Sequence, residues 1–216
     1  MKYDELFKEI KENHLAVGRV LLGQEIFPLD FLAVAILNRS LCNSAAFTTL
    51  MAARNFIGAA PFIRFQIDNA LRFYASLLVD EPHEFAKAVL EGSRVSRLKD
   101  RSGKKLTDGY LVETLMADDR LPFDRTWIKS TYEATSGYVH LSEKHILNSV
   151  TTSGPNALKG KISEVDSHVP DQVYQEGVLA FCEATKVTLT LVSYWAQQKN
   201  SAANTRHETN RSAPTR

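Results

Sequence analysis

Charged residues inside the most apolar stretch of the chain, residues 56–79, constrain its fold more than any other feature. Arg64, Asp68 and Arg72 lie four residues apart in this stretch. On an α-helix each step of four residues turns the side chain by only about 40°, so these three residues, the first ladder, share one face. An isolated buried charge is costly, and the first ladder therefore needs hydrogen-bonding partners on a neighbouring element.

A second set of polar residues with the same spacing provides candidate partners. Tyr132, Ser136 and His140, the second ladder, recur every four residues in a segment that favours a helix. Packed together, the two ladders would form a polar seam inside a helical bundle. The sequence leaves open whether this seam is structural or a small binding site.

Length and charge set the outer bounds. A chain of 216 residues, 44% of them hydrophobic, can bury a substantial core. We predict one domain over residues 1–199 and a disordered tail over residues 200–216, which are rich in Ser, Asn, Thr and Arg. The formal net charge of +1 excludes a global field of the kind that draws a protein onto DNA or an anionic membrane. Any contact with nucleic acid must therefore be local.

Three features predict a cytoplasmic protein without a membrane span. Cys42 and Cys182 have no Cys or His nearby at metal-ligand spacing, so we expect two buried free thiols in a reducing compartment. The N-terminus is charged and amphipathic and lacks the apolar core of a secretion signal. The best apolar run, residues 31–37, is far shorter than the roughly 18 to 20 residues that cross a bilayer.

Hydrophobic periodicity predicts an all-α bundle of five to seven helices. The helix that carries the first ladder is apolar nearly all round, so it is expected at the centre. Residues 146–152 and 159–165 favour strands and flank a turn at residues 153–156, which predicts a small β-hairpin before the last long helix. The other helices are expected over residues 3–22, 28–54, 82–91, 108–116, 124–140 and 170–198, with Asp108 and Asp124 as N-caps.

The two ladders carry a resemblance to a known group of proteins. Arg64 and Asp68 late in one apolar helix, together with the second ladder and the following residues 141–145, Leu-Ser-Glu-Lys-His, resemble a group of bacterial helical domains of unknown function. That group is similar to the HEPN superfamily of helical bundles. The resemblance covers roughly residues 30–195 and implies an intracellular bundle, often dimeric, found in phage-defence and toxin–antitoxin settings. A module that binds RNA or a nucleotide, in a phage-defence or stress-response setting, is the function that it implies.

The sequence departs from the HEPN nuclease motif at one position. HEPN ribonucleases resemble one another in an Arg, a polar residue, three to five further residues and then a His, and the Arg and His cleave RNA without metal. Before His140 this chain has Glu-Ala-Thr-Ser at residues 133–136, so the local arginine is missing. In a ribonuclease with an altered motif, Arg64 or Arg72 would have to supply the positive charge from the central helix.

The residues of the two ladders suit phosphate chemistry. RNA cleavage through the 2′-hydroxyl needs a base, an acid and positive charge beside the phosphate. The imidazole of His140 suits proton transfer, and the guanidinium of Arg64 can hold a phosphate bidentately. The candidate catalytic residues are therefore His140 and Arg64, and the candidate binding residues are Asp68, Arg72, Tyr132 and Ser136.

Two interpretations without catalysis stay open. In the first, the ladders are structural: Arg64 pairs with Asp68 on its own helix, while Ser136 and His140 form hydrogen bonds to neighbouring helices. In the second, the protein is a non-catalytic helical scaffold whose helices bind a protein partner.

The basic segment, residues 94–105, offers a second candidate for phosphate contacts. Asp100 is the only acidic residue in this segment, and no aromatic residue is interleaved for base stacking. The candidate contacts are Arg94, Arg97, Arg101, Lys104 and Lys105. The chain has no glycine-rich phosphate loop, no nucleophile elbow and no acidic cluster with a supporting His, so we predict no metal and no cofactor.

Overall fold

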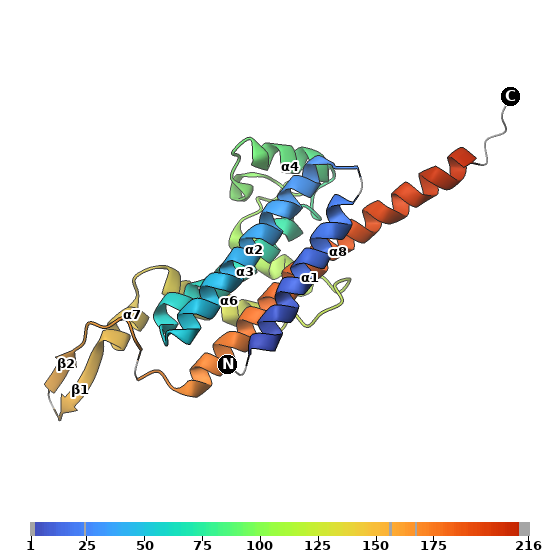
Figure 1. The fold of residues 1–216 in the computed structure, drawn as a ribbon. Helices are drawn as coiled ribbons and strands as arrows, with labels where there is room; N and C mark the ends of the chain where they lie inside the picture. The colour runs from blue at the N-terminus through green and yellow to red at the C-terminus, as the bar shows by residue number, and fades with distance from the viewer. Residues whose placement is uncertain (1–2, 24, 156, 167, 212–216) are drawn as a thin grey trace.

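The computed structural model describes residues 3–23, 25–155, 157–166 and 168–211 (Figure 1). These residues form eight α-helices, one short 3₁₀ helix and one two-stranded hairpin. The helices are α1 (Asp4–Leu22), α2 (Pro28–Ala52), α3 (Phe56–Ala75), α4 (Pro82–Leu90), α5 (Asp108–Ala117), α6 (Ile128–Val139), α7 (Glu143–Ser149) and α8 (Asp171–Arg211); the 3₁₀ helix spans Val95–Arg97, and the strands are β1 (Val150–Gly154) and β2 (Ala157–Gly160). The predicted all-α bundle with a hairpin before the last long helix is confirmed, with one helix more than expected.

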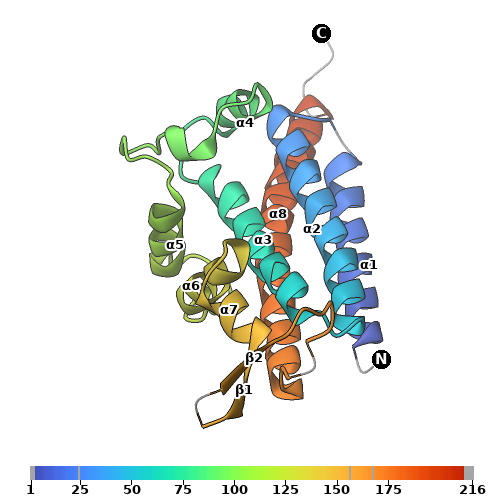
Figure 2. The same cartoon turned by 90° about the vertical axis from the view of Figure 1, so that its left-hand side faces the viewer.

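Helix α3 lies at the centre of the bundle, as its apolar surface predicts. It packs against α2 and α8, and its remaining side faces α5 and α6 (Figure 2). Ile67, Leu71 and Phe73 are at most 2% exposed, and the burial of such side chains from several directions stabilises the helix. The helix begins before Pro61, because Asn55 caps it by accepting a hydrogen bond from the Gly58 N–H at 2.8 Å.

The segment after α6 differs from the prediction. The sequence favours a strand from Ile146, but residues 146–149 belong to α7. Ser142 starts this helix: its Oγ accepts from the Lys144 N–H, while its own N–H donates to His145 Nδ1, both at 3.3 Å. The hairpin is therefore shorter than predicted, with Val150 opposite Gly160 and Gly154 opposite Ala157. Asn156, in the predicted turn, lies outside the described residues.

Asp166 fixes the hairpin segment to the bundle. Its carboxylate is buried and accepts the Ile57 N–H at 2.9 Å, in the first turn of α3. The same carboxylate accepts Asn148 Nδ2 of α7 at 2.7 Å. Free N–H groups and the helix dipole favour a carboxylate at a helix N-terminus. The two ends of the hairpin segment are thus held together at the start of α3.

Helix α8 continues to Arg211, past its predicted end near residue 198. The predicted disordered tail of residues 200–216 overlaps this helix. The side chains of residues 200–211 and the whole of residues 212–216 lie outside the described part of the chain.

The two cysteines are free, but only one is buried. Burial of Cys182 on α8 raises the pKa of its thiol to about 12. Cys42 is exposed, so the prediction of two buried thiols is wrong for this residue. It lies on the outer face of α2, together with exposed Ala35, Asn38 and Ala45 at helical spacing.

Among the described residues, one helix is long and apolar enough to cross a membrane. This helix is α2, with a mean hydropathy of 1.2. A core helix of a folded domain meets the same criterion. In this structure α2 packs against α1, α3, α4 and α8, and it buries the polar residues Asp30 and Ser40.

Candidate functional site

The two ladders meet at a pocket of about 330 Å³ between α3 and α6. Arg64 and Asp68 enter it from α3, and Tyr132 and Ser136 enter it from α6. His140, which directly follows the last residue of α6, also lines it. The remaining lining residues are Arg39, Phe65, Asp108 and Val139. The structure thus brings together five of the six predicted residues of the ladders.

Alternating charges run along one wall of this pocket. Asp68 accepts Nη1 of Arg39 at 2.9 Å and Nη2 of Arg72 at 2.8 Å. Asp108 accepts Nη2 of Arg72 at 2.6 Å and Nη2 of Arg64 at 3.3 Å. Three arginines therefore share two aspartates, which leaves one formal positive charge in excess.

Arg64 does not pair with Asp68 on its own helix, contrary to the structural interpretation. A pair at i, i+4 is more favourable with the acid on the N-terminal side, so Asp68 binds Arg72 rather than Arg64. Arg64 reaches Asp108 of α5 instead. Asp108 is the first residue of α5 and not its N-cap, which is Thr107, so its carboxylate is available for the arginines.

The guanidinium of Arg64 is the group best placed to bind an anion. Its side chain is only 11% exposed, and its Cζ lies 3.8 Å from the centre of the Tyr132 ring. Of the three guanidinium nitrogens of Arg64, only Nη2 makes a hydrogen bond to a described residue. The N–H groups on Nε and Nη1 stay available, and each can donate a charge-assisted hydrogen bond to an oxygen of a phosphate or carboxylate.

Arg72 has a different position from the one predicted. It lies behind the pocket wall, where its Nη2 bridges Asp68 and Asp108. Its Nη1 is buried and has no hydrogen-bond partner among the described residues. Arg72 therefore holds the two carboxylates in place rather than lining the pocket.

Among the described residues, Ser136 and His140 form no hydrogen bonds to neighbouring helices, which is a second departure from the structural interpretation. Ser136 Oγ lies 2.6 Å from the carbonyl oxygen of Tyr132, one turn earlier on its own helix. Helix α6 ends at Val139, and His140 follows in extended conformation, with φ −117° and ψ 153°. Its imidazole is exposed at the pocket and makes no hydrogen bond within the described residues.

Sequence reasoning missed Arg39 and Asp108 as site residues. Arg39 extends from α2, where its half-exposed side chain also donates to Asn69 Oδ1 at 2.7 Å. A signal was present, because Arg39 is the only charged residue between Asp30 and Arg54. Asp108 carried no comparable signal, since an acid at the start of a helix usually needs no distant partner.

Asp124, like Asp108, is predicted to be an N-cap, but it does not cap α6, whose N-cap is Trp127. Asp124 accepts hydrogen bonds from the N–H and the hydroxyl of Thr126, both at 2.9 Å, in a turn before α6. The helix itself begins at Ile128. The second ladder is therefore carried by a shorter helix than predicted.

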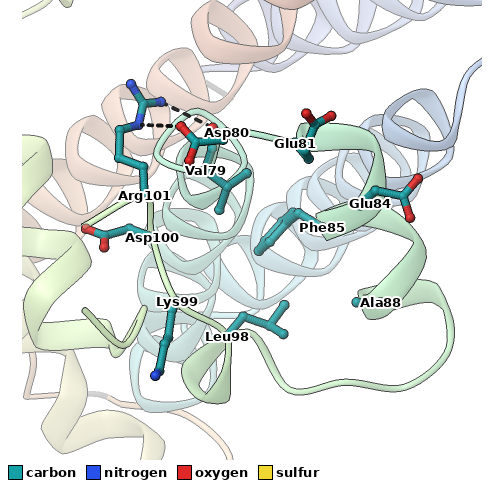
Figure 3. Close-up of a pocket in the computed structure, with 10 residues that line it drawn as sticks. All are labelled: Val79, Asp80, Glu81, Glu84, Phe85, Ala88, Leu98, Lys99, Asp100 and Arg101. Carbon is teal, nitrogen blue, oxygen red and sulfur yellow. Dashed lines mark hydrogen bonds and ion pairs between the residues drawn. The ribbon is translucent and has the colours of Figure 1, made fainter. Parts of the chain in front are cut away.

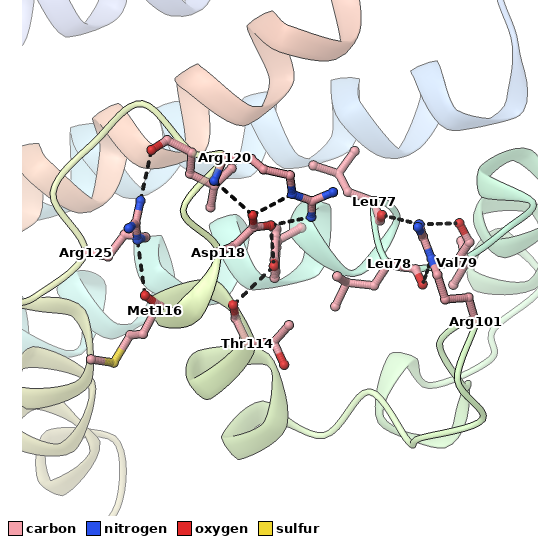
Figure 4. Close-up of polar contacts among 11 residues, drawn as sticks. Leu77, Leu78, Val79, Arg101, Thr114, Met116, Asp118, Arg120 and Arg125 are labelled. Atoms are coloured by element: carbon pink, nitrogen blue, oxygen red, sulfur yellow. Dashed lines mark hydrogen bonds and ion pairs between the residues drawn. The ribbon is translucent and has the colours of Figure 1, made fainter.

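Part of the basic segment has a structural role. The guanidinium of Arg101 donates to the carbonyl oxygens of Leu77, Leu78 and Val79 at 2.8, 3.1 and 3.2 Å, just beyond the end of α3 (Figure 4). Lys104 lies 5.5 Å from the centre of the Tyr110 ring. Arg101 is thus bound to backbone oxygens, whereas Arg94, Arg97 and Lys105 are exposed and remain candidates for phosphate contacts.

A second pocket, of about 350 Å³, lies beside this segment but has the wrong charge for a phosphate (Figure 3). Four of its lining residues are acidic and two are basic. The acidic ones are Asp80, Glu81, Glu84 and Asp100. Hydrogen bonds to Asp100, above all from the Tyr110 hydroxyl, lower the pKa of this carboxyl to about 2, so it stays charged.

The described residues contain no group of three or more His, Cys, Asp or Glu side chains that could hold a metal ion. The pocket between α3 and α6 instead combines guanidinium donors, carboxylates, a hydroxyl and an imidazole, which can bind an anion and move a proton. No family model, no curated protein and no solved structure matches this chain.

Proposed function

We propose that the protein is a HEPN-like module that binds RNA or a nucleotide through a phosphate group in the pocket between α3 and α6. The observation that carries this proposal is the guanidinium of Arg64, held over Tyr132 with two of its nitrogens free of hydrogen bonds in the described chain. The resemblance described above supports RNA or a nucleotide as the ligand and an intracellular defence or stress response as the setting.

The charge balance of the pocket supports an anionic ligand. One positive charge remains after Arg39, Arg64 and Arg72 have shared Asp68 and Asp108. Charges interact more strongly in a partly buried site than in water, so a phosphate in this pocket would gain more than at the surface. His140 would lie beside that phosphate and add positive charge whenever its imidazole is protonated.

Thermal shift and calorimetry with inorganic phosphate, AMP and a short RNA test this proposal. A bound ligand stabilises the fold by about 2.7 kcal/mol at 100 times its dissociation constant. We expect Arg64→Ala to abolish the shift and Arg39→Gln to weaken binding about tenfold, the loss of about one charge-assisted hydrogen bond. Asp108 keeps Arg72 in the Arg64 variant, so the fold should persist, which circular dichroism checks.

A matched control is Arg19→Gln, which removes the same charge from an exposed position on α1 outside the pocket. Binding that survives Arg64→Ala, or that falls equally in Arg19→Gln, would contradict the proposed site. No response to any of the three probes would favour the scaffold alternative. Its candidate surface is the apolar groove of about 470 Å³ between α1 and α2, where Leu15 and Leu22 are exposed.

A metal-independent ribonuclease is the second candidate function, and the exposure of His140 at the Arg64 pocket favours it. In that case the protein should cleave RNA in the presence of EDTA. His140→Ala should abolish cleavage without unfolding the protein, whereas His168→Ala, at another exposed histidine, should leave it unchanged. Cleavage that persists in His140→Ala would rule out this role for the imidazole.

A further inference from the structure

The hydroxyl of Ser136 has a fixed hydrogen-bonding direction. Its Oγ lies 2.6 Å from the carbonyl oxygen of Tyr132. A carbonyl carries no proton, so the hydroxyl must be the donor in this bond. What Ser136 presents to the pocket is therefore a pair of oxygen lone pairs, which can only accept a hydrogen bond.

The pocket thus has two kinds of polar surface. Arg39 and Arg64 offer N–H donors, and they suit the oxygens of a phosphate. Ser136 offers an acceptor, and a phosphate that is fully ionised has no proton to give to it. The half-buried Ser136 Oγ would lose water on binding without gaining a donor, so a bare phosphate group is an incomplete ligand for this pocket.

We infer that the ligand is a phosphate ester with a free hydroxyl close to its phosphate, and that Ser136 selects it by accepting the hydrogen bond of that hydroxyl. Sugar phosphates and ribonucleotides share this chemistry. The inference rests on the proposed function, because it takes Arg64 as the phosphate-binding group. Ser136 becomes the residue that determines specificity, whereas Arg39 and Arg64 determine affinity for the charge.

The test compares four ligands by calorimetry on the full chain at pH 8: AMP, 2′,3′-dideoxy-AMP, methyl ribofuranoside 5-phosphate and its 2,3-dideoxy analogue, in which the methyl group blocks the anomeric hydroxyl. The hydroxylated member of each pair should bind about 3- to 10-fold more tightly, the value of one neutral hydrogen bond. Ser136→Ala should remove this preference by weakening only the hydroxylated ligands. Ser136→Thr keeps a hydroxyl that can donate one turn back, so it should retain the preference.

Ser130→Ala is the matched control. Ser130 is also on α6, and its Oγ also donates to a backbone carbonyl, that of Trp127 at 3.0 Å, but it lies outside the pocket. Its loss should change the binding of none of the ligands. Both variants remove a hydroxyl that donates to a backbone carbonyl about one turn earlier, so a change in binding confined to Ser136→Ala points to the pocket.

The possible outcomes separate this inference from the proposed function. Equal binding of hydroxylated and dideoxy ligands would overturn the selection by Ser136 and leave phosphate binding in place. A preference that survives Ser136→Ala would move the acceptor role to Asp68 or Asp108, and would equally overturn it. Absence of binding by all four ligands would overturn both proposals. A preference found only in the AMP pair identifies a nucleotide ligand, and one found in both pairs extends it to sugar phosphates.

Discussion

Two clusters of ion pairs in the molecule differ in how deeply they are buried and in how completely their charges are paired. Asp30 is fully buried and accepts three hydrogen bonds, from Phe27 N–H and Trp195 Nε1 at 2.7 Å and from Lys199 Nζ at 2.8 Å. One acid there meets one base. In the pocket between α3 and α6, three arginines share two aspartates, and two nitrogens of Arg64 make no hydrogen bond to the residues that the structure describes.

This difference separates a structural ion pair from a candidate binding site. Removing two charges from water is offset only when good hydrogen bonds surround both of them, as the three donors around Asp30 and the two acceptors around Lys199 do. An incomplete set of bonds is unfavourable in the absence of water or a ligand. The two regions therefore differ both in the exposure of their charged side chains and in the number of donors that lack a partner among the described residues.

The largest expected effect follows from breaking the closed pair. In Lys199→Met the carboxylate of Asp30 would stay buried without its counter-charge. We expect the free energy of unfolding to fall by about 3–5 kcal/mol, which urea denaturation measures. Lys186→Met on the same helix breaks an exposed pair with Glu183 and should cost less than about 1 kcal/mol. Similar losses in the two variants would show that burial of the Asp30 pair carries no special cost.

A smaller effect is expected in the open cluster. In Arg72→Met, Asp68 keeps Arg39 and Asp108 keeps Arg64, and the two aspartate side chains are 18% and 34% exposed. The free energy of unfolding should fall by about 1–2 kcal/mol in the same urea experiment. A loss as large as that of Lys199→Met would mean that the cluster is as closed as the Asp30 pair.

The smallest effect concerns pH and a second closed contact, that of His14. Burial lowers the pKa of this imidazole below 6.5, although a hydrogen bond to the Ile10 carbonyl raises it in part. As the pH falls, the unfolded chain takes up the proton before the folded one. The stability from neutral His14 is thus fully present above about pH 6.5 and is lost below it, by at most about 1.4 kcal/mol per pH unit.

Urea denaturation at pH 8 and pH 5.5, with His14→Gln as the reference, measures this dependence. The wild type should lose more stability between the two pH values than the variant does. Identical losses would mean that the folded chain takes up a proton on His14 as readily as the unfolded chain does, which would contradict the lowered pKa.

The sequence was sufficient to place α3 and to bring the ladders together, because both follow from one physical requirement. A helix that is apolar nearly all round must be central, and charges on it need polar residues on the next helix. The choice of partners was not accessible in the same way. Arg64 pairs with a residue 44 positions away, and local spacing does not indicate which distant acid a fold brings near. The orientation rule for i, i+4 pairs would, however, have favoured Arg72 over Arg64 as the partner of Asp68.

The contact between Asn148 and Asp166 has a consequence for how the chain can vary in length. The hydrogen bond between these two residues joins the ends of the segment that contains the hairpin, and Asp166 holds both ends at the first turn of α3. Since the entropy of closing a loop rises only slowly with its length, residues added to or removed from the hairpin tip should alter stability little. The bundle can therefore tolerate an arm of very different size at this point without a shift in the helix that carries Arg64.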